Sequence, residues 1–260
     1  MKIALLDSGI GLLPAAAAVR GLRPDADLVL SSDPASMPWG PRASEDITRL
    51  ALGAAEAAAA LEPDALVIAC NTASTHALPA LRARFEDTFP VIGTVPAIKP
   101  AAAFGAPVAI WATPATTGSD YQRRLIAEFA PGGNVTAVAC PGLADAVQHA
   151  DEAATEAAIA DAAARTPAGV RVVVLGCTHY ELVGARIAAA LTRPGGAAPT
   201  LLGSAPAVAA QALRRAAGGP VDLTRTGELT VLLGGVEEPL PPEALAYAEG
   251  RLLAGVGAAR

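Results

Sequence analysis

Lysine is nearly absent from this sequence, in which it occupies only positions 2 and 99. Enzymes that use pyridoxal phosphate need a lysine that forms a Schiff base with the cofactor. Lys2 stands at the start of an expected strand and Lys99 in a proline-rich joint, so neither position suits that role. We therefore expect a protein that works without a pyridoxal cofactor.

Cysteine is also scarce, with single residues at positions 70, 140 and 177. An odd number of cysteines at the ends of expected strands suits a reducing compartment better than a disulfide framework. The sequence contains no CxxC, HxH or HExxH pattern, whereas a structural zinc site needs four ligands at close spacing. These observations predict a cytoplasmic protein without a bound metal.

Positive charge is in deficit, with 19 lysines and arginines against 25 acidic residues and a net charge of −6. This balance, together with the lack of a basic tract, argues against a nucleic-acid partner. The longest charge-poor stretch, residues 88–119, is interrupted by prolines, so we expect no membrane span. A strand pattern follows Met1 directly, so we also expect no signal peptide.

Two stretches of the sequence share one pattern, a run of branched apolar residues that ends at a cysteine followed by small polar residues. The first covers residues 66–74 (Leu-Val-Ile-Ala-Cys-Asn-Thr-Ala-Ser) and the second residues 172–180 (Val-Val-Val-Leu-Gly-Cys-Thr-His-Tyr). Each apolar run is typical of a buried parallel strand. The polar residues then fall at the carboxyl end of that strand, where open α/β sheets bind ligands.

A second pair of expected strand ends repeats at nearly the same interval. Asp7 precedes Cys70 by almost the same distance in sequence as Thr113 precedes Cys177. This spacing suggests an old duplication, in which each half carries a polar strand end and then a cysteine. It predicts two thiols on opposite walls of one cleft.

Strands and helices alternate along the whole chain, which predicts parallel sheets with right-handed crossovers. We expect an α/β protein of two pseudo-symmetric, doubly wound domains with the active site in the cleft between them. The proline-rich residues 90–100 mark the first boundary. The first domain is expected over residues 1–94 plus 206–260, where the C-terminal segment returns to it, and the second domain over residues 95–205.

Three local features are also expected near the polar strand ends. The pattern predicts a helix from about residue 75 to 89 after the first cysteine and another from about 181 to 191 after the second. Ser44, followed by two acidic residues, is expected to be the N-cap of a helix that runs to about residue 61.

A symmetric pair of thiols suits a two-base racemisation, in which one thiol removes a proton from a carbon and the other delivers a proton to the opposite face. The α-proton of an amino acid is very weakly acidic, so the site must stabilise the carbanion through desolvation and hydrogen bonds. Each thiol also needs a neighbour that tunes its proton affinity. Asp7 is the expected partner of Cys70, and His179 that of Cys177.

Two simpler interpretations of these residues remain open at this point. Asp7 could cap the helix that follows its strand. His179 and Cys177, two residues apart, could form a papain-like pair, although that leaves the second matched cysteine unexplained.

Seven motifs of this chain are familiar, at residues 7–11, 38–40, 70–74, 90–93, 112–116, 140–143 and 176–180. With them the chain resembles the glutamate racemases of the aspartate/glutamate racemase superfamily, cofactor-independent enzymes that make D-glutamate for peptidoglycan. The resemblance extends from Asp7 to about Ser204, and the motifs around the two cysteines at 70 and 177 are the specific ones.

The resemblance implies that Cys70 takes the proton from D-glutamate and Cys177 from L-glutamate, with Asp7 and His179 assisting. It implies no cofactor and no metal, and, because such racemases are often dimers, a homodimer as one arrangement. The residues that it implies hold the substrate are Asp7, Ser8, Trp39, Gly40, Asn71, Thr72, Thr113, Thr116, Thr178 and His179.

Five positions depart from the family pattern. Trp39 stands where the family usually has tyrosine, and Leu12 where it has glycine. Glu181 replaces a proline, and Gly203 replaces a common aspartate. Gln148 stands where a glutamate commonly assists catalysis; it can orient a substrate through hydrogen bonds but cannot take a proton.

These departures keep two alternatives open beside glutamate racemisation. One is a racemase of aspartate or of another amino acid, because pocket positions have changed. The other is a weakly active regulatory or binding homologue, suggested by Gln148. A single-thiol decarboxylase is disfavoured because both cysteines are present.

Overall fold

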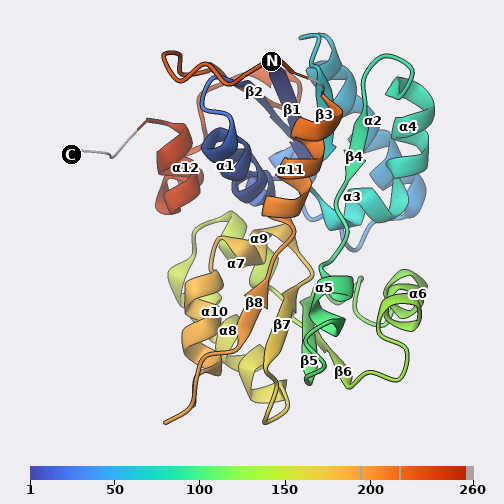
Figure 1. Ribbon diagram of the computed structural model, residues 1–260, viewed down its shortest axis with the longest axis vertical. Coiled ribbons are helices and arrows are strands. Elements are labelled where there is room, and N and C mark those ends of the chain that lie inside the picture. Colours follow the sequence, from blue (N-terminus) through green and yellow to red (C-terminus); the bar gives the residue numbers. More distant parts are fainter. Residues whose placement is uncertain (194, 217, 256–260) are drawn as a thin grey trace. The chain divides into compact units, whose positions relative to one another are not determined.

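The computed structural model of the protein describes residues 1–193, 195–216 and 218–255 (Figure 1). The chain divides into two compact units. The first consists of Met1–Val95 together with the segment from Ala205 onward, and the second of Pro96–Ser204. Residues 217 and 256–260, which belong to the expected returning segment, lie outside the described residues.

The first unit is built on a six-stranded sheet with the order β10-β9-β2-β1-β3-β4 among the described residues. All neighbouring strands are parallel except β10, which pairs with β9 in the antiparallel direction at the edge. The strands are β1 (Lys2–Asp7), β2 (Asp27–Ser32), β3 (Ala65–Ile68), β4 (Val91–Gly93), β9 (Leu229–Leu233) and β10 (Val236–Glu237).

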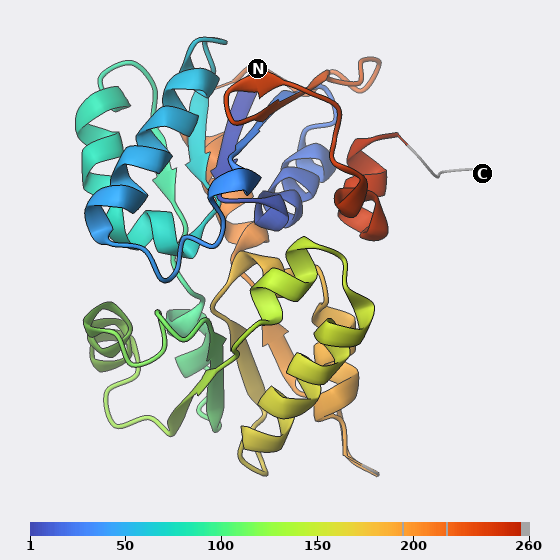
Figure 2. The ribbon, with the colours of Figure 1, turned by 180° about the vertical axis from the view of Figure 1, so that it is seen from behind.

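Helices cover both faces of this sheet, because alternate side chains of a strand point to opposite faces. Ala4 and Leu6 of β1 pack in one core cluster with Ile47 of α2, whereas Ile3 and Leu5 are buried on the opposite face. Figures 1 and 2 show α1 and α11 on one face and α2 on the other. The helices are α1 (Leu13–Leu22), α2 (Ser44–Ala59), α3 (Asn71–His76), α4 (Leu78–Phe85), α11 (Ala205–Arg215) and α12 (Ala248–Leu253), with 3-10 turns η1 (Ile10–Leu12), η2 (Pro34–Ser36) and η3 (Pro242–Ala246).

The second unit contains a parallel sheet with the order β6-β5-β7-β8. Its strands are β5 (Val108–Ala112), β6 (Val135–Ala139), β7 (Val172–Leu175) and β8 (Thr200–Leu202). One core cluster joins Ile110 and Val174 of this sheet to Ile98 of α5. The helices are α5 (Ile98–Ala102), α6 (Asp120–Phe129), α7 (Leu143–Gln148), α8 (Glu152–Arg165), α9 (Thr178–Glu181) and α10 (Gly184–Leu191).

The two sheets repeat one local strand order. In each unit the second strand lies on one side of the first, and the third and fourth strands lie on its other side. The order therefore reverses between β1 and β3 in the first unit and between β5 and β7 in the second. Ligands of doubly wound sheets bind outside the carboxyl strand ends at this switch point. The predicted α/β class with parallel sheets is confirmed.

The predicted start of both helices that follow the cysteines is wrong. Helix α3 begins at Asn71 and α9 at Thr178, each directly after its cysteine. Cys70 is the N-cap of α3, a role for which sequence patterns favour serine, threonine, asparagine or aspartate. A second helix, α4, then begins at Leu78, and Pro79 in its first turn has no backbone N–H with which to continue the first helix.

The predicted cap at Ser44 is also wrong by one residue. Ala43 is the N-cap of α2 and makes no side-chain cap bond, and Ser44 is the first helical residue. The hydroxyl of Ser44 instead lies 3.2 Å from Nδ1 of His76. The acidic residues Glu45 and Asp46 do occupy the first turn, where they interact favourably with the helix dipole.

We expect Gly176→Ala to destabilise the protein, because the backbones of β5 and β7 come very close at this position. The Gly176 N–H donates to the Trp111 carbonyl oxygen at 2.7 Å, and an added Cβ would lie 2.9 Å from that oxygen. The expected loss in free energy of unfolding is about 1–3 kcal/mol, measured by urea denaturation.

Gly53→Ala is the matched control, since an added Cβ meets nothing within 4 Å there. Gly53 lies in the middle of α2, where alanine favours the helix more than glycine does. Gly53→Ala is therefore expected to raise the free energy of unfolding by up to about 1 kcal/mol. Equal effects of the two substitutions would contradict the close backbone approach at Gly176.

Candidate active site

The candidate site of the first unit lies at the carboxyl ends of the neighbouring strands β1 and β3. Leu6 and Ile68 are partners in the parallel register, and the Ala69 N–H continues the ladder by donating to the Leu6 carbonyl at 2.7 Å. Asp7 ends β1 and Cys70 follows β3, so the structure brings them to the same sheet edge. This edge is the switch point of the first sheet.

Asp7 is fully buried, although a buried carboxylate is costly unless hydrogen bonds stabilise it. It accepts hydrogen bonds from the backbone N–H of Ser8 and from the Ser8 hydroxyl at 2.9 Å. The N-cap residues of η1 and α1 are Gly9 and Leu12, and neither helix has a side-chain cap bond. Asp7 itself lies two residues before the N-cap position of η1.

Cys70 is buried and its sulfur accepts a hydrogen bond from the Ala73 N–H at 3.5 Å. A backbone donor at the first turn of a helix stabilises negative charge on a thiol sulfur. Asn71, also buried, and the half-buried Thr72 follow in that turn. The local fold thus places three residues of the expected site around one helix start.

A buried hydroxyl pair supports the connection from β3 to α3. The Ser74 hydroxyl donates to the Ile68 carbonyl at 3.2 Å, and the Thr94 hydroxyl donates to the same oxygen at 2.8 Å. The Thr94 N–H donates in turn to Ser74 Oγ at 2.8 Å. Sequence reasoning missed the role of Thr94, for which its hydroxyl directly after a short strand is the only signal.

Trp39, one of the residues expected to hold the substrate, packs in the core of the first unit. The residue is only 2% exposed and belongs to the core cluster of the first unit. Its indole N–H, the single donor of this side chain, bonds to Ser36 Oγ at 2.7 Å. Gly40, which follows Trp39 in this loop, is half-buried.

The candidate site of the second unit has the same layout, with Thr113 after β5 and Cys177 after β7. These strands are neighbours, and Trp111 pairs with Leu175 in the register. The Thr113 hydroxyl donates to Thr116 Oγ1 at 3.2 Å. Cys177 is half-buried and is the N-cap residue of α9, as Cys70 is of α3.

Cys177, His179 and Gln148 form a connected series. Sγ of Cys177 lies 4.0 Å from Nδ1 of His179, and Nε2 of the same ring lies 3.1 Å from Oε1 of Gln148. Because an amide oxygen only accepts, the His179 ring is the donor in this contact, through Nε2. The structure thus places Gln148, a residue able to orient a substrate through hydrogen bonds, against the ring of His179.

The third cysteine has a different environment. Cys140 is buried, and burial raises the pKa of its thiol to about 12. Its carbonyl accepts a hydrogen bond from the Tyr180 hydroxyl at 3.3 Å, and burial also raises the pKa of Tyr180 well above its ordinary value. At neutral pH Cys140 therefore remains a thiol and supports α9 through its backbone.

Residues 1–193, 195–216 and 218–255 contain no group of three or more His, Cys, Asp and Glu side chains that could hold a metal ion. Within the same ranges no helix is long and apolar enough to cross a membrane.

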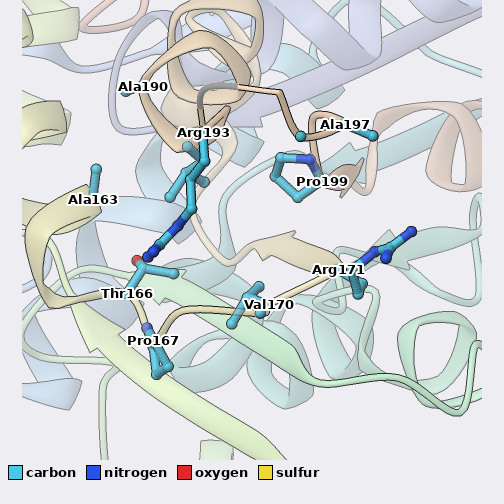
Figure 3. Close-up of a pocket in the computed structure, with 12 residues that line it drawn as sticks. Ala163, Thr166, Pro167, Val170, Arg171, Ala190, Arg193, Ala197 and Pro199 are labelled. Carbon is cyan, nitrogen blue, oxygen red and sulfur yellow. The ribbon is translucent and has the colours of Figure 1, made fainter.

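A pocket of about 220 Å³ in the second unit lies away from this candidate site (Figure 3). Val170 and Arg171, which line it, precede β7, whereas Cys177 follows the other end of that strand. Figure 3 shows the Arg193 side chain extending toward Thr166 and that of Arg171 pointing elsewhere. The pocket therefore lies at the amino ends of the strands, whereas the candidate site lies at their carboxyl ends.

Comparisons with known proteins place the chain among racemases. The family model described as Asp/Glu/Hydantoin racemase matches residues 15–219. A glutamate racemase of Roseiflexus sp. (strain RS-1) is 38% identical over 215 residues, which are 80% of this chain and 76% of that protein. A glutamate racemase of Herpetosiphon aurantiacus is 35% identical over 191 residues, 72% of this chain and 74% of that protein.

Among solved structures, this chain is similar to Escherichia coli glutamate racemase in complex with L-glutamate and the activator UDP-MurNAc-ala. The TM-score is 0.78 at 27% sequence identity, and the match covers 94% of this chain and 91% of that one. The length of the family match and the identity to these relatives show that the chain belongs to the Asp/Glu/hydantoin racemase family.

Proposed function

We propose that this protein interconverts L- and D-glutamate without a cofactor, using Cys70 and Cys177 as its two bases. The observation that carries the proposal is the repeated layout of the two units. In each, a cysteine follows the strand beside the switch point and forms the N-cap of a helix. Membership of the racemase family supports the reaction class.

The proton balance of the reaction needs one thiolate and one thiol. In the direction from L- to D-glutamate, the Cys177 thiolate removes the α-proton and becomes a thiol. The Cys70 thiol then delivers its proton to the opposite face of the carbanion and becomes a thiolate. The reverse direction exchanges the two roles, so the mechanism requires both sulfur atoms to reach one α-carbon from opposite faces.

Neighbouring groups support each thiol in this mechanism. The Ala73 N–H, which already donates to Cys70, stabilises the Cys70 thiolate, and the buried Asp7 assists on the same side. On the other side the Nδ1 lone pair of His179 can accept the proton of the Cys177 thiol. The proton affinities of both sulfur atoms thus depend on groups that the fold holds in place.

Polar side chains at the same strand ends are proposed to hold the substrate. Asp7 suits the ammonium group, and hydroxyl and amide donors suit the carboxylates and the negative charge that develops on deprotonation. Loss of one such preorganised donor typically costs about 3 kcal/mol of transition-state stabilisation. The proposed donors are Ser8, Gly40, Asn71, Thr72, Thr113, Thr116 and Thr178, with the main chain of Trp39.

Glutamate is proposed as the substrate because relatives at 38% and 35% identity are named glutamate racemases. A solved relative also holds L-glutamate. The product D-glutamate would serve peptidoglycan synthesis in the cytoplasm. Aspartate is the competing substrate, and the same assay distinguishes it.

The first test follows the α-proton signal of L- and D-glutamate by proton NMR in D₂O, with purified protein and no added cofactor. We expect both enantiomers to lose the signal, and Cys70→Ala and Cys177→Ala each to abolish conversion. Cys140→Ala, which removes the buried thiol outside the mechanism, is the control and is expected to retain activity. If aspartate exchanges its α-proton and glutamate does not, the substrate is aspartate instead of glutamate. If neither acid exchanges, the proposal is refuted.

A second prediction concerns the reactivity of the three thiols. Iodoacetamide at pH 8 should alkylate the half-buried Cys177 first and leave Cys140 unmodified, because the pKa of Cys140 is about 12 and its side chain is buried. Peptide mass spectrometry measures the modification at each site. Glutamate should protect Cys177, whereas protein unfolded in urea should react at all three cysteines. Alkylation of native Cys140 as fast as Cys177 would contradict this assignment.

A third prediction concerns Gln148, the partner of His179. Gln148→Ala should lower kcat about 10- to 100-fold, since His179 loses the bond that orients its ring. Gln148→Glu keeps an acceptor oxygen and should retain most of the activity. Gln211→Ala on the surface helix α11 is the matched control. Equal activity of Gln148→Ala and the control would show that His179 needs no such partner.

A further inference from the structure

The helix α9 that follows Cys177 is too short to hold its own orientation. α9 comprises only four residues, Thr178–Glu181, whereas isolated helices shorter than about 12 residues are marginal in water because nucleation is costly. The directions of the Cys177 sulfur and the His179 ring must therefore come from contacts with the rest of the second unit.

Three successive side chains of this turn supply such contacts, each to a different element. His179 bonds to Gln148 at the end of α7. Tyr180 donates to the carbonyl of Cys140 after β6. Glu181 reaches the connection that follows β8, where the proposed mechanism assigns it no role.

The Glu181 contact is a charge-assisted pair of hydrogen bonds to one residue. Its Oε1 accepts from the Ser204 backbone N–H at 2.8 Å and from the Ser204 hydroxyl at 2.9 Å. Ser204 is buried, and the helix α11 starts directly after it. Hydrogen bonds to an ionised acceptor are roughly twice as strong as neutral ones.

Gly203 provides the space for this carboxylate. A Cβ built on residue 203 would collide with the Oε2 and Cδ atoms of Glu181 and lie 3.0 Å from its Cγ. Any larger residue at position 203 would displace the Glu181 carboxylate from its bonds to Ser204. The glutamate at 181 and the glycine at 203, two departures from the family pattern, therefore fit each other.

We propose that Glu181 is a positioning residue, which holds the Cys177–His179 turn for proton transfer by bonding to Ser204, and that Gly203 is required because it leaves room for this bond. This inference rests on the proposed racemase function. Glu181 itself exchanges no proton with the substrate; it acts through the orientation of the turn that it ends.

Glu181→Ala and Glu181→Gln test the role of the carboxylate. Glu181→Ala should lower kcat about 10- to 100-fold, as misplacement of a reacting group by about 1 Å does, with little change in KM. Glu181→Gln keeps an acceptor oxygen for Ser204 and should recover most of the activity. Glu156→Ala, which removes an exposed ion pair with Arg186 in the same unit, is the control and should behave as wild type.

Deuterium isotope effects distinguish positioning from a general loss of structure. Cys177 removes the deuteron of α-deuterated L-glutamate. If Glu181→Ala slows only this step, the deuterium isotope effect on kcat/KM should rise with that substrate. It should fall with α-deuterated D-glutamate, because removal by Cys70 then ceases to limit the rate. Equal changes for both enantiomers would overturn the assignment to the Cys177 turn.

Gly203→Ala displaces the carboxylate without altering it. We expect a loss of kcat similar to that of Glu181→Ala, together with a lower Tm. In the double variant the two losses of kcat should not add. Its Tm should lie above that of Gly203→Ala, because the clash with the Glu181 side chain is gone. Gly184→Ala is the matched control, since its added Cβ would make an ordinary contact of 3.7 Å with Leu201.

The outcomes separate this inference from the proposed function. Wild-type protein that exchanges no α-proton of any acid tested would overturn both. An active wild type with fully active Glu181→Ala and Gly203→Ala variants would overturn the positioning role alone. Strictly additive losses of kcat and Tm in the double variant would show that residues 181 and 203 do not act through one contact.

Discussion

Parallel pairing of β1 with β3, and of β5 with β7, is the constraint on which the candidate site depends. Strands that run in the same direction end at the same edge of a sheet, so the residues after them become neighbours. Asp7 and Cys70 follow one such pair of strands, and Thr113 and Cys177 follow the other. The second pairing also needs a glycine at 176, because the carbonyl of Trp111 occupies the space of a side chain there. The chemistry of each unit therefore depends on backbone registers that core packing holds.

Buried polar groups around the two cysteines are held by specific partners. Asp7 bonds to Ser8 in the first unit, and His179 contacts Gln148 in the second. A buried polar group that loses its partner costs about 1–3 kcal/mol, so such contacts allow few alternative arrangements. This rigidity suits a reaction without an electron sink, because donors that are already oriented need no reorganisation when charge develops.

The departures from the family pattern gain meaning only in three dimensions. Taken one at a time, Gln148 suggested weak activity, and Glu181 and Gly203 suggested a changed pocket. In the structure Gln148 supplies an acceptor for His179, and the side chain of Glu181 lies where a side chain on residue 203 would otherwise be. Trp39 likewise proves to be a core residue whose indole bonds to Ser36. Substitutions that look independent along the chain can thus be parts of one contact.

The sequence by itself determined the α/β class, the order of strands and helices and the positions of the polar strand ends, because hydrophobic periodicity and β-branched runs are local properties. It also made the two cysteines the candidate bases, since their matching contexts are visible without a fold. The starts of α3 and α9 were predicted too late, because each has a cysteine at the N-cap position, a residue type outside the usual capping residues. Only the tertiary structure decided which partner each polar side chain has. Gln148 and His179 are 31 residues apart and Glu181 and Ser204 are 23 apart, and their contacts depend on how separate elements pack, which no local pattern encodes.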